Sequence, residues 1–489
     1  MVDARESPCA ALWRVGAARS VGGMDVREVD VVVIGAGPAG ENVADRTVRG
    51  GLSTVIVEAE LVGGECSYWA CMPSKALLRP AAALRAARGA RGVTGGELDV
   101  HEVLARRDGF AAHWHDDGQV EWLESAGIEL VRGRATLTGD RAVRVAGSDG
   151  DLELRAAHAV VVATGSVPRI PGIPGLAEAR PWTSREATAM AQVPGRIAII
   201  GGGVVAVEAA TFLHDLGSAV TLLSRGRLLR GFEPFAGELV RDALRDRGVD
   251  VREGVSPAAV SRTDEVRIRL EGGEEVAADE VLVATGREPA TAELGLETVG
   301  LEPGRPIEVD DSMQAPTLPW LYAVGDANGR ALLTHQGKYQ ARLAGDAIVA
   351  RAAGEEVEEV RWGRHSATAD HAAVPQVVFS DPEVAAVGIT AAQAEERGLR
   401  HRVLDYDLAQ VAGAGLLADD YAGRVRAVVD EDRRIIVGLT LVGPGAGELL
   451  HAATIAVVGE VPLERLWHAV PAYPTLSEFW LRLLEEYGL

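Results

Sequence analysis

The stretch Val29-Asp-Val-Val-Val-Ile34-Gly35-Ala-Gly37-Pro-Ala-Gly40 joins a short apolar run to a glycine-rich turn. The β-branched run is typical of a buried parallel strand. Gly35 permits the tight turn, Gly37 lets a pyrophosphate approach the backbone, and Gly40 lets the following helix pack on the strand. A second strand, residues 54–57, ends at Glu58, the position that bonds a ribose hydroxyl of an adenine nucleotide. The stretch therefore predicts a nucleotide-binding α/β unit.

The same pattern restarts at residues 196–200 and continues into Gly201-Gly-Gly203-Val-Val-Ala206. Its second strand, residues 218–223, ends without an acidic residue, and Arg225 and Arg230 follow. Arginines without a competing carboxylate suit a 2′-phosphate, so this unit predicts NADPH rather than NADH. The alternative is that these arginines are simply solvated. An apolar strand that ends in Ala-Thr-Gly closes each unit, at Gly165 and at Gly286.

Between the two units lies Gly63-Gly-Glu-Cys66-Ser-Tyr-Trp-Ala-Cys71-Met-Pro-Ser-Lys75, which holds two of the three cysteines. It precedes a helix expected over residues 73–88. Two thiols this close can form a disulfide, and a helix N-terminus lowers the pKa of a thiol. The alternative from the residues alone is a pair of small buried apolar side chains.

The rest of the chain adds one more candidate site and a change of texture. The strand 318–324 ends in Gly325-Asp326, where Asp326 could hold a ribityl hydroxyl or merely cap a helix. From residue 367 onward strands alternate with helices at 390–397, 446–458 and 477–487. That pattern predicts an α+β domain without a phosphate-binding turn.

Composition narrows the partners. With 49 Lys and Arg against 71 Asp and Glu, the net charge is −22, which argues against nucleic acid or an anionic membrane as a partner. We find no apolar run of membrane-spanning length. Three cysteines suit a reducing cytosol, so we expect a cytoplasmic protein. Residues 1–23, with Cys9, show no clear periodicity and are expected to form a flexible extension.

Taken together, these motifs resemble the flavoprotein disulfide reductases of the pyridine-nucleotide class, the family of dihydrolipoamide dehydrogenase, glutathione reductase and mercuric reductase. Two C-terminal stretches extend the resemblance, Phe379-Ser-Asp-Pro-Glu383 and Pro474-Thr-Leu-Ser-Glu478. The resemblance implies an FAD enzyme that forms a homodimer, in which the partner chain completes each active site. It implies two Rossmann-like nucleotide-binding domains and a C-terminal α+β dimerisation domain. The expected domains are an extension (1–28), an FAD-binding domain (29–177 and 307–364), an NAD(P)-binding domain (178–306) and a dimerisation domain (365–489).

Roles for four residues follow from the resemblance by position. Cys71 resembles the charge-transfer thiol beside the flavin, and Cys66 resembles the interchange thiol that faces the substrate. Lys75 and Glu208 resemble the ion pair near flavin N5, which favours negative charge on the reduced ring.

The chain departs from the family pattern in two places. Tyr68 and Trp69 stand between the cysteines and are expected to narrow or cover the disulfide. Pro471 and Tyr473 stand where the family carries its two active-site histidines, although Glu478, the usual partner of the base, remains. His468 and His335 are weaker candidates for a substitute base. Mercuric reductase is disfavoured, because the C-terminus has no cysteine pair to pass mercury inward, and we expect no metal site.

The sequence therefore predicts an FAD-dependent oxidoreductase that passes electrons from NADPH through a redox-active Cys66–Cys71 disulfide to a small acceptor. The acceptor could be a low-molecular-weight disulfide or a quinone. An enzyme of the dihydrolipoamide dehydrogenase type is one alternative. A redox-sensing flavoprotein with slow turnover is another.

Overall fold

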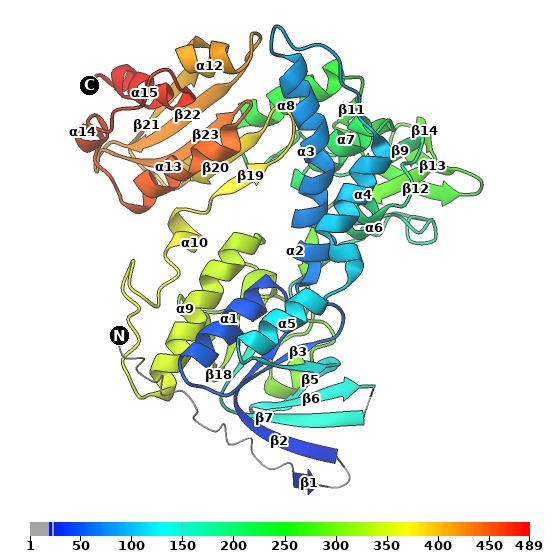
Figure 1. The fold of residues 1–489 in the computed structure, drawn as a ribbon, viewed down its shortest axis with the longest axis vertical. Helices are drawn as coiled ribbons and strands as arrows, with labels where there is room; N and C mark the ends of the chain where they lie inside the picture. Colours follow the sequence, from blue (N-terminus) through cyan, green and yellow to red (C-terminus); the bar gives the residue numbers. More distant parts are fainter. Residues whose placement is uncertain (1–18, 22–23, 149) are drawn as a thin grey trace, which may run out of the picture.

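A computed structural model describes residues 19–21, 24–148 and 150–489. Figure 1 shows three regions that meet near the long helix α3 (Cys71–Arg88). One contains β2 (Met24–Ile34), the second contains β9 (Arg196–Ile200), and the third contains the C-terminal helices. The two glycine turns therefore belong to different regions.

The first region is built on a nine-stranded sheet in which β2 runs parallel to β3 and β7. Val31 and Val33 pack against α1 (Pro38–Arg49) and α9 (Thr334–Ala352), whereas Val32 packs with β5 and β6 on the opposite face. Because both faces are covered, the strand is continuously apolar. The other strands are β1 (Arg19–Val21), β3 (Thr54–Glu58), β4 (Glu129–Arg132), β5 (Arg134–Gly139), β6 (Ala142–Gly147), β7 (Gly150–Val162), β17 (Gln314–Ala315) and β18 (Leu318–Ala323).

The expected extension ends earlier than predicted. Residues 24–28 belong to β2, where Asp25 to Glu28 pair with Leu152 to Arg155 of β7, and β1 pairs with the start of the same strand. The prediction of a flexible segment up to residue 28 is therefore wrong for these residues. Backbone pairing extends the strand beyond its apolar part, which periodicity alone did not reveal. Residues 1–18 and 22–23 of that prediction, including Cys9, lie outside the described residues.

The helical stretch after the cysteines is not continuous. Helix α3 begins at Cys71, two residues before the predicted start, and ends at Arg88. A segment rich in glycine then leads to α4 (Val100–Phe110), and α5 (Asp117–Ser125) follows.

The second glycine turn lies in a four-stranded parallel sheet with the strand order β11–β10–β9–β15. Helix α7 (Val204–Asp215) follows the turn directly and buries most of its residues. The other elements are β10 (Ala219–Ser224), β11 (Asp250–Glu253), β15 (Glu280–Val283), α8 (Pro234–Asp246) and a ribbon of β12 (Pro257–Arg262), β13 (Val266–Leu270) and β14 (Glu275–Ala278).

The two regions are joined where their Ala-Thr-Gly strand ends meet. Strand β8 (Ser166–Pro168), after Gly165, pairs with β16 (Arg287–Pro289), after Gly286. The short helix α6 (Ser184–Ala189) follows the proline-containing connector and precedes β9. The connector thus leads directly past the site described below.

The C-terminal region is a five-stranded antiparallel sheet covered by helices, as the α+β prediction requires. Its strands follow the order β19–β20–β23–β22–β21, and α13 (Ala446–Val458) packs on β20 and β23. The remaining elements are β19 (Gln376–Val378), β20 (Val384–Gly388), β21 (His401–Asp407), β22 (Arg424–Asp430), β23 (Ile435–Val442), α10 (Ala369–Ala372), α11 (Ala391–Glu396), α12 (Ala412–Leu417), α14 (Leu463–Leu466) and α15 (Phe479–Tyr487).

One ion pair with a buried carboxylate links the C-terminal region to the second region. Arg426 donates to Glu233 at 3.0 Å, and the Glu233 carboxylate also accepts the backbone amide of Ala391. Among the described residues, no helix is both long and apolar enough to cross a membrane.

Candidate active site

The two cysteines lie at the meeting point of two helices. Cys66 belongs to the short helix α2 (Gly64–Tyr68), and Cys71 is the first residue of α3. Both thiols are free and half-buried, and they lie near enough to each other to shift each other's pKa. The structure therefore brings together the pair that the sequence singled out.

The two thiols differ in acidity. The hydrogen bond from Cys66, opposed by burial, lowers the pKa of Cys71 to about 6, and Thr334 and Lys75 contribute in the same direction. The same hydrogen bond between the two thiols, together with burial, raises the pKa of Cys66. One proton is thus shared between the thiols, with the negative charge held on Cys71.

Thr334 is a site residue that the sequence argument missed. Its hydroxyl lies 3.2 Å from Cys71 Sγ, at the first residue of α9. The next residue, His335, was the candidate from the sequence, but its ring contacts the Pro375 carbonyl at 2.8 Å on the surface. The available signal was a helix start directly after the Gly-Asp strand, because the N-terminal turn of a helix favours an anion.

Lys75 and Glu208 form an ion pair beside the thiols. Lys75 Nζ lies 2.7 Å from Glu208 Oε2, and the Glu208 side chain is almost fully buried. The other carboxylate oxygen accepts the backbone amide of Phe379 at 3.0 Å, while Lys75 Nζ sits 4.9 Å from the centre of the Phe379 ring. Glu208 is thereby fixed by groups from two other regions of the chain.

These groups line one cavity of about 1120 Å³ that runs from the first glycine turn to the thiols. A cavity of this size suits a large cofactor, since ordinary ligand pockets measure roughly 300–1,000 Å³. Its lining includes Gly35, Gly37, Glu58, Cys66, Trp69, Cys71, Lys75, Gly165, Arg185, Glu208, Arg287, Gly325, Asp326 and Thr334.

The first glycine turn fits the pyrophosphate of a dinucleotide. A side chain at Gly35 would meet the Ala163 carbonyl oxygen at 2.6 Å, and one at Gly40 would meet the Gly35 carbonyl oxygen at 1.9 Å. Nothing lies within 4 Å of a Cβ placed at Gly37. Gly35 and Gly40 therefore allow the tight backbone, and the open space at Gly37 is where a phosphate would approach.

Two half-buried carboxylates flank this turn. Glu58 accepts the amides of Ala36 at 2.7 Å and of Glu60 at 2.8 Å, and burial raises its pKa despite these bonds. Burial also raises the pKa of Asp326, which accepts a hydrogen bond from Ser166 at 2.5 Å. Both carboxylates line the cavity, where their free lone pairs can accept hydroxyl groups of a bound FAD.

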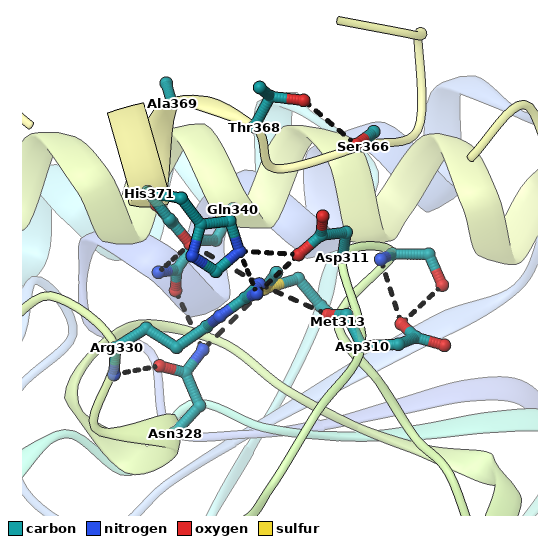
Figure 2. A network of polar contacts seen from close by, with 12 residues as sticks. Asp310, Asp311, Met313, Asn328, Arg330, Gln340, Ser366, Thr368, Ala369 and His371 are labelled. Carbon is teal, nitrogen blue, oxygen red and sulfur yellow. Dashed lines mark hydrogen bonds and ion pairs between the residues drawn. The ribbon is translucent and has the colours of Figure 1, made fainter. Parts of the chain in front are cut away.

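A polar network, shown in Figure 2, holds the loop that carries Asp326. Gln340 Oε1 accepts both the Gly325 amide at 2.8 Å and the Asn328 side chain at 2.9 Å. Its amide nitrogen donates to Asp370 at 2.9 Å, in the segment that leads to the C-terminal sheet. The position of Asp326 is therefore tied to that segment.

The second glycine turn repeats the geometry of the first. A Cβ at Gly201 would meet the Ala284 carbonyl oxygen at 2.2 Å, whereas nothing lies within 4 Å of one at Gly203. Strand β10 ends at Ser224, whose hydroxyl donates to the Gly226 carbonyl. Arg225 and Arg230 follow on the surface. Both arginines are thus near the end of β10, the end where an acidic residue would contact a ribose.

The two aromatic residues between the cysteines have different positions. Tyr68 is 2% exposed, and its hydroxyl donates to the Val62 carbonyl at 2.8 Å. Trp69 lines the cavity with the cysteines, and the guanidinium of Arg185 lies over its ring. Of the two, only Trp69 is placed to restrict access to the thiols.

The segment expected to hold the base has no histidine in contact with Glu478. Tyr473 is 76% exposed in the single chain, and His468 is also on the surface. Glu478 is buried and receives a hydrogen bond from Arg482, while its Oε2 has no hydrogen-bond partner among the described residues. The structure therefore does not bring Tyr473 and Glu478 together within one chain.

The chain belongs to the pyridine nucleotide-disulphide oxidoreductases. The model of that family matches residues 29–347, and the model of its dimerisation domain matches residues 374–483. This membership makes the protein an FAD-dependent enzyme with an NAD(P)H-binding domain that forms a homodimer.

Several relatives cover nearly the whole chain. A dihydrolipoyl dehydrogenase of Chlorobaculum tepidum is 34% identical over 92% of this chain and 95% of its own. A mercuric reductase of Staphylococcus aureus is 30% identical over 92% of this chain and 81% of its own. Among solved structures, LpdA of Mycobacterium tuberculosis matches with a TM-score of 0.80 at 25% identity, over 94% of this chain and 100% of its own. The HOCl-induced flavoprotein disulfide reductase RclA of Escherichia coli matches with a TM-score of 0.79 at 25% identity, over 93% of this chain and 99% of its own.

Proposed function

We propose that this enzyme takes hydride from NADPH, reduces its own Cys66–Cys71 disulfide, and passes two electrons to a small acceptor. The observation that carries the proposal is the asymmetric thiol pair, in which Cys71 has its pKa lowered to about 6 next to the Lys75–Glu208 ion pair. A thiolate beside a fixed cation is the arrangement that thiol–disulfide chemistry requires.

Bound FAD would supply the step that accepts hydride and hands two electrons to the disulfide. The residues proposed to hold it are the open backbone at Gly37, the carboxylates of Glu58 and Asp326, and the strand end at Gly165. Lys75, kept in place by Glu208, places positive charge beside Cys71 and so stabilises its thiolate. Cys66 keeps the shared proton and is the thiol left to attack or release a substrate.

The preference for NADPH rests on the end of β10. Strand β10 ends in the neutral hydroxyl of Ser224, which donates to the Gly226 carbonyl, so this position has no carboxylate to accept both hydroxyl groups of a ribose. Arg225 and Arg230 supply positive charge near the same strand end, and charge-assisted hydrogen bonds to phosphate are strong. Gly201, Gly203 and Gly286 would form the backbone of this nucleotide site.

Two acceptor classes remain, a low-molecular-weight disulfide and a quinone-like molecule. Exchange with a thiol substrate needs a general base, and Tyr473 stands where the family carries the histidine that would supply one. A quinone takes its electrons without that base. The position of Tyr473 therefore favours a quinone-like acceptor over dihydrolipoamide.

The test is a steady-state screen of the purified dimer. NADPH oxidation is followed with glutathione disulfide, lipoamide, quinones and metal ions in turn. The proposal expects rapid turnover with one acceptor and a long-wavelength charge-transfer band after one equivalent of reductant. Very slow oxidation with every acceptor, beside a normal band, would instead identify a redox-sensing flavoprotein.

A further inference from the structure

The two cysteines are separated by a junction of unusual backbone geometry. Helix α2 ends at Tyr68 and α3 begins at Cys71, so that only Trp69 and Ala70 connect them. Ala70 has φ −133° and ψ −96°, which lies outside the helical and strand regions. Residues in sparsely populated regions persist when their surroundings hold them there.

The carbonyl of Trp69 needs a hydrogen-bond donor from outside α3. In a continuous helix its partner would be the amide four residues later, but that residue is Pro73, which has none. The hydroxyl of Thr188, a buried residue of α6, lies 2.9 Å from the Trp69 carbonyl oxygen. It lies equally close to the Ser184 carbonyl, and its single proton is shared between these acceptors.

The ring of Trp69 is held from the same helix. The Arg185 guanidinium lies 4.1 Å from the ring centre, a distance typical of a cation–π contact. Arg185 also donates to both oxygens of Glu60, at 2.9 and 3.0 Å, and to Glu65, the residue before Cys66. The Arg185 side chain thus contacts residues both before and after Cys66.

Helix α6 is itself firmly anchored. Thr183 and Glu186 form a reciprocal capping box at its start. Arg107, which is 2% exposed, donates from α4 to the carbonyl oxygens of Thr188 and Met190 at its end. The helix can therefore act as a rigid support for the junction.

We propose that Arg185 and Thr188 are positioning residues of the dithiol–disulfide reaction, holding Trp69 and thereby keeping Cys66 and Cys71 at a separation from which the disulfide closes. The inference rests on the proposed redox role of these cysteines. In the reaction with glutathione, two glutathione thiols are oxidised to one glutathione disulfide, and the Cys66–Cys71 disulfide is reduced to two thiols. Loosening the junction lowers the effective concentration of one thiol at the other, so the equilibrium moves toward the dithiol.

The experiment equilibrates holoprotein dimers with glutathione buffers of defined ratio and measures the oxidised fraction of the Cys66–Cys71 pair by alkylation and mass spectrometry. Thr188→Val removes the hydroxyl, and Arg185→Gln removes the ring contact and both carboxylate pairs. Thr188→Val is expected to favour the dithiol by about threefold to tenfold, the usual effect of one lost hydrogen bond, and Arg185→Gln by at least as much. Thr188→Ser restores the donor and should match the wild type.

Arg144→Gln serves as the matched control. Arg144 of β6 forms an exposed ion pair with Asp151 of β7, and neither residue lines the cavity. A purely structural role would lower the melting temperature of Thr188→Val and Arg185→Gln while leaving their redox equilibrium equal to that of the wild type. That result would overturn the proposal. A wild type that forms no Cys66–Cys71 disulfide at any buffer ratio would overturn the redox role itself, and the inference with it.

Discussion

The cysteine turn, residues 63–75, and the C-terminal segment 470–478 differ in how many of their polar side chains have hydrogen-bond or ion-pair partners. At the turn, Cys71 contacts Thr334 and Lys75 contacts Glu208, with distances of 3.2 and 2.7 Å. In the segment, Tyr473 is exposed in the single chain and Glu478 is engaged by Arg482. One region is organised to hold a thiolate, and the other contains no histidine.

This difference separates two parts of the chemistry. Stabilising a thiolate requires nearby donors and cations, and these are present at the turn. Exchanging that thiolate with a thiol substrate also requires a general base with a pKa near the working pH. The comparison therefore predicts that internal electron transfer is retained while exchange with thiol substrates is weak.

The largest expected effect concerns the thiolate itself. Cys71→Ser should abolish the charge-transfer band, whereas Cys66→Ser should retain a band even when the protein is oxidised, because it keeps Cys71, the thiolate proposed to lie beside the flavin. The measurement is the long-wavelength absorbance of the purified Cys71→Ser and Cys66→Ser variants, which reports the charge-transfer band. Equal bands in both variants would contradict the assignment of the charge to Cys71.

The next effect tests the C-terminal side of the comparison. Without a histidine base, turnover of dihydrolipoamide should fall below NADPH–quinone turnover by about 10²- to 10⁴-fold, the usual contribution of general-base catalysis. Tyr473→Phe should leave the quinone rate within a few-fold, because a quinone needs no such base. The measurement is kcat/KM for both substrates in wild type and variant.

Rapid dihydrolipoamide turnover in the wild type, lost in Tyr473→Phe, would instead make Tyr473 a working proton donor. A variant that is unchanged with every substrate, beside rapid wild-type turnover of dihydrolipoamide, would leave the base to another residue. Either result would contradict the prediction that exchange with thiol substrates is weak.

A smaller effect concerns the nucleotide that feeds the turn. Replacing both Arg225 and Arg230 by alanine should raise the KM for NADPH by about ten- to hundredfold, because a charge-assisted contact contributes about 1.5–3 kcal/mol. The KM for NADH should change little, since NADH has no 2′-phosphate. A wild type that prefers NADH at low concentration would refute the role of these arginines.

Much of the fold could be predicted because short local sequence patterns indicate its strands, turns and helices. The runs before Gly35 and Gly201 are short, β-branched and followed by glycines, and the structure places each in a parallel sheet before a helix. The start of β2 was missed, because three of residues 24–28 are charged and their strand depends on pairing with β7. Such pairing is a long-range contact that periodicity does not report.

The candidate site was predictable only in part, for the same reason. Cys66, Cys71 and Lys75 are neighbours in sequence, so their spacing could be recognised. Thr334 and Arg185 are far from them along the chain and have no unusual sequence around them. Their contacts with the turn exist only because α9 and α6 fold back onto it.

Thr334 gives the smallest and sharpest test of the cysteine side. Its hydroxyl donates to the Cys71 thiolate and, with Lys75, helps to lower the pKa of that thiol. A thiolate is present above its pKa and is lost as the pH falls through it, so the charge-transfer band of the wild type should fade near pH 6. Thr334→Val removes the donor and should move this loss upward by about one pH unit. Thr334→Ser keeps the hydroxyl and should titrate like the wild type. If the valine variant also titrated like the wild type, Lys75 and the proton shared with Cys66 would account for the thiolate without help from α9.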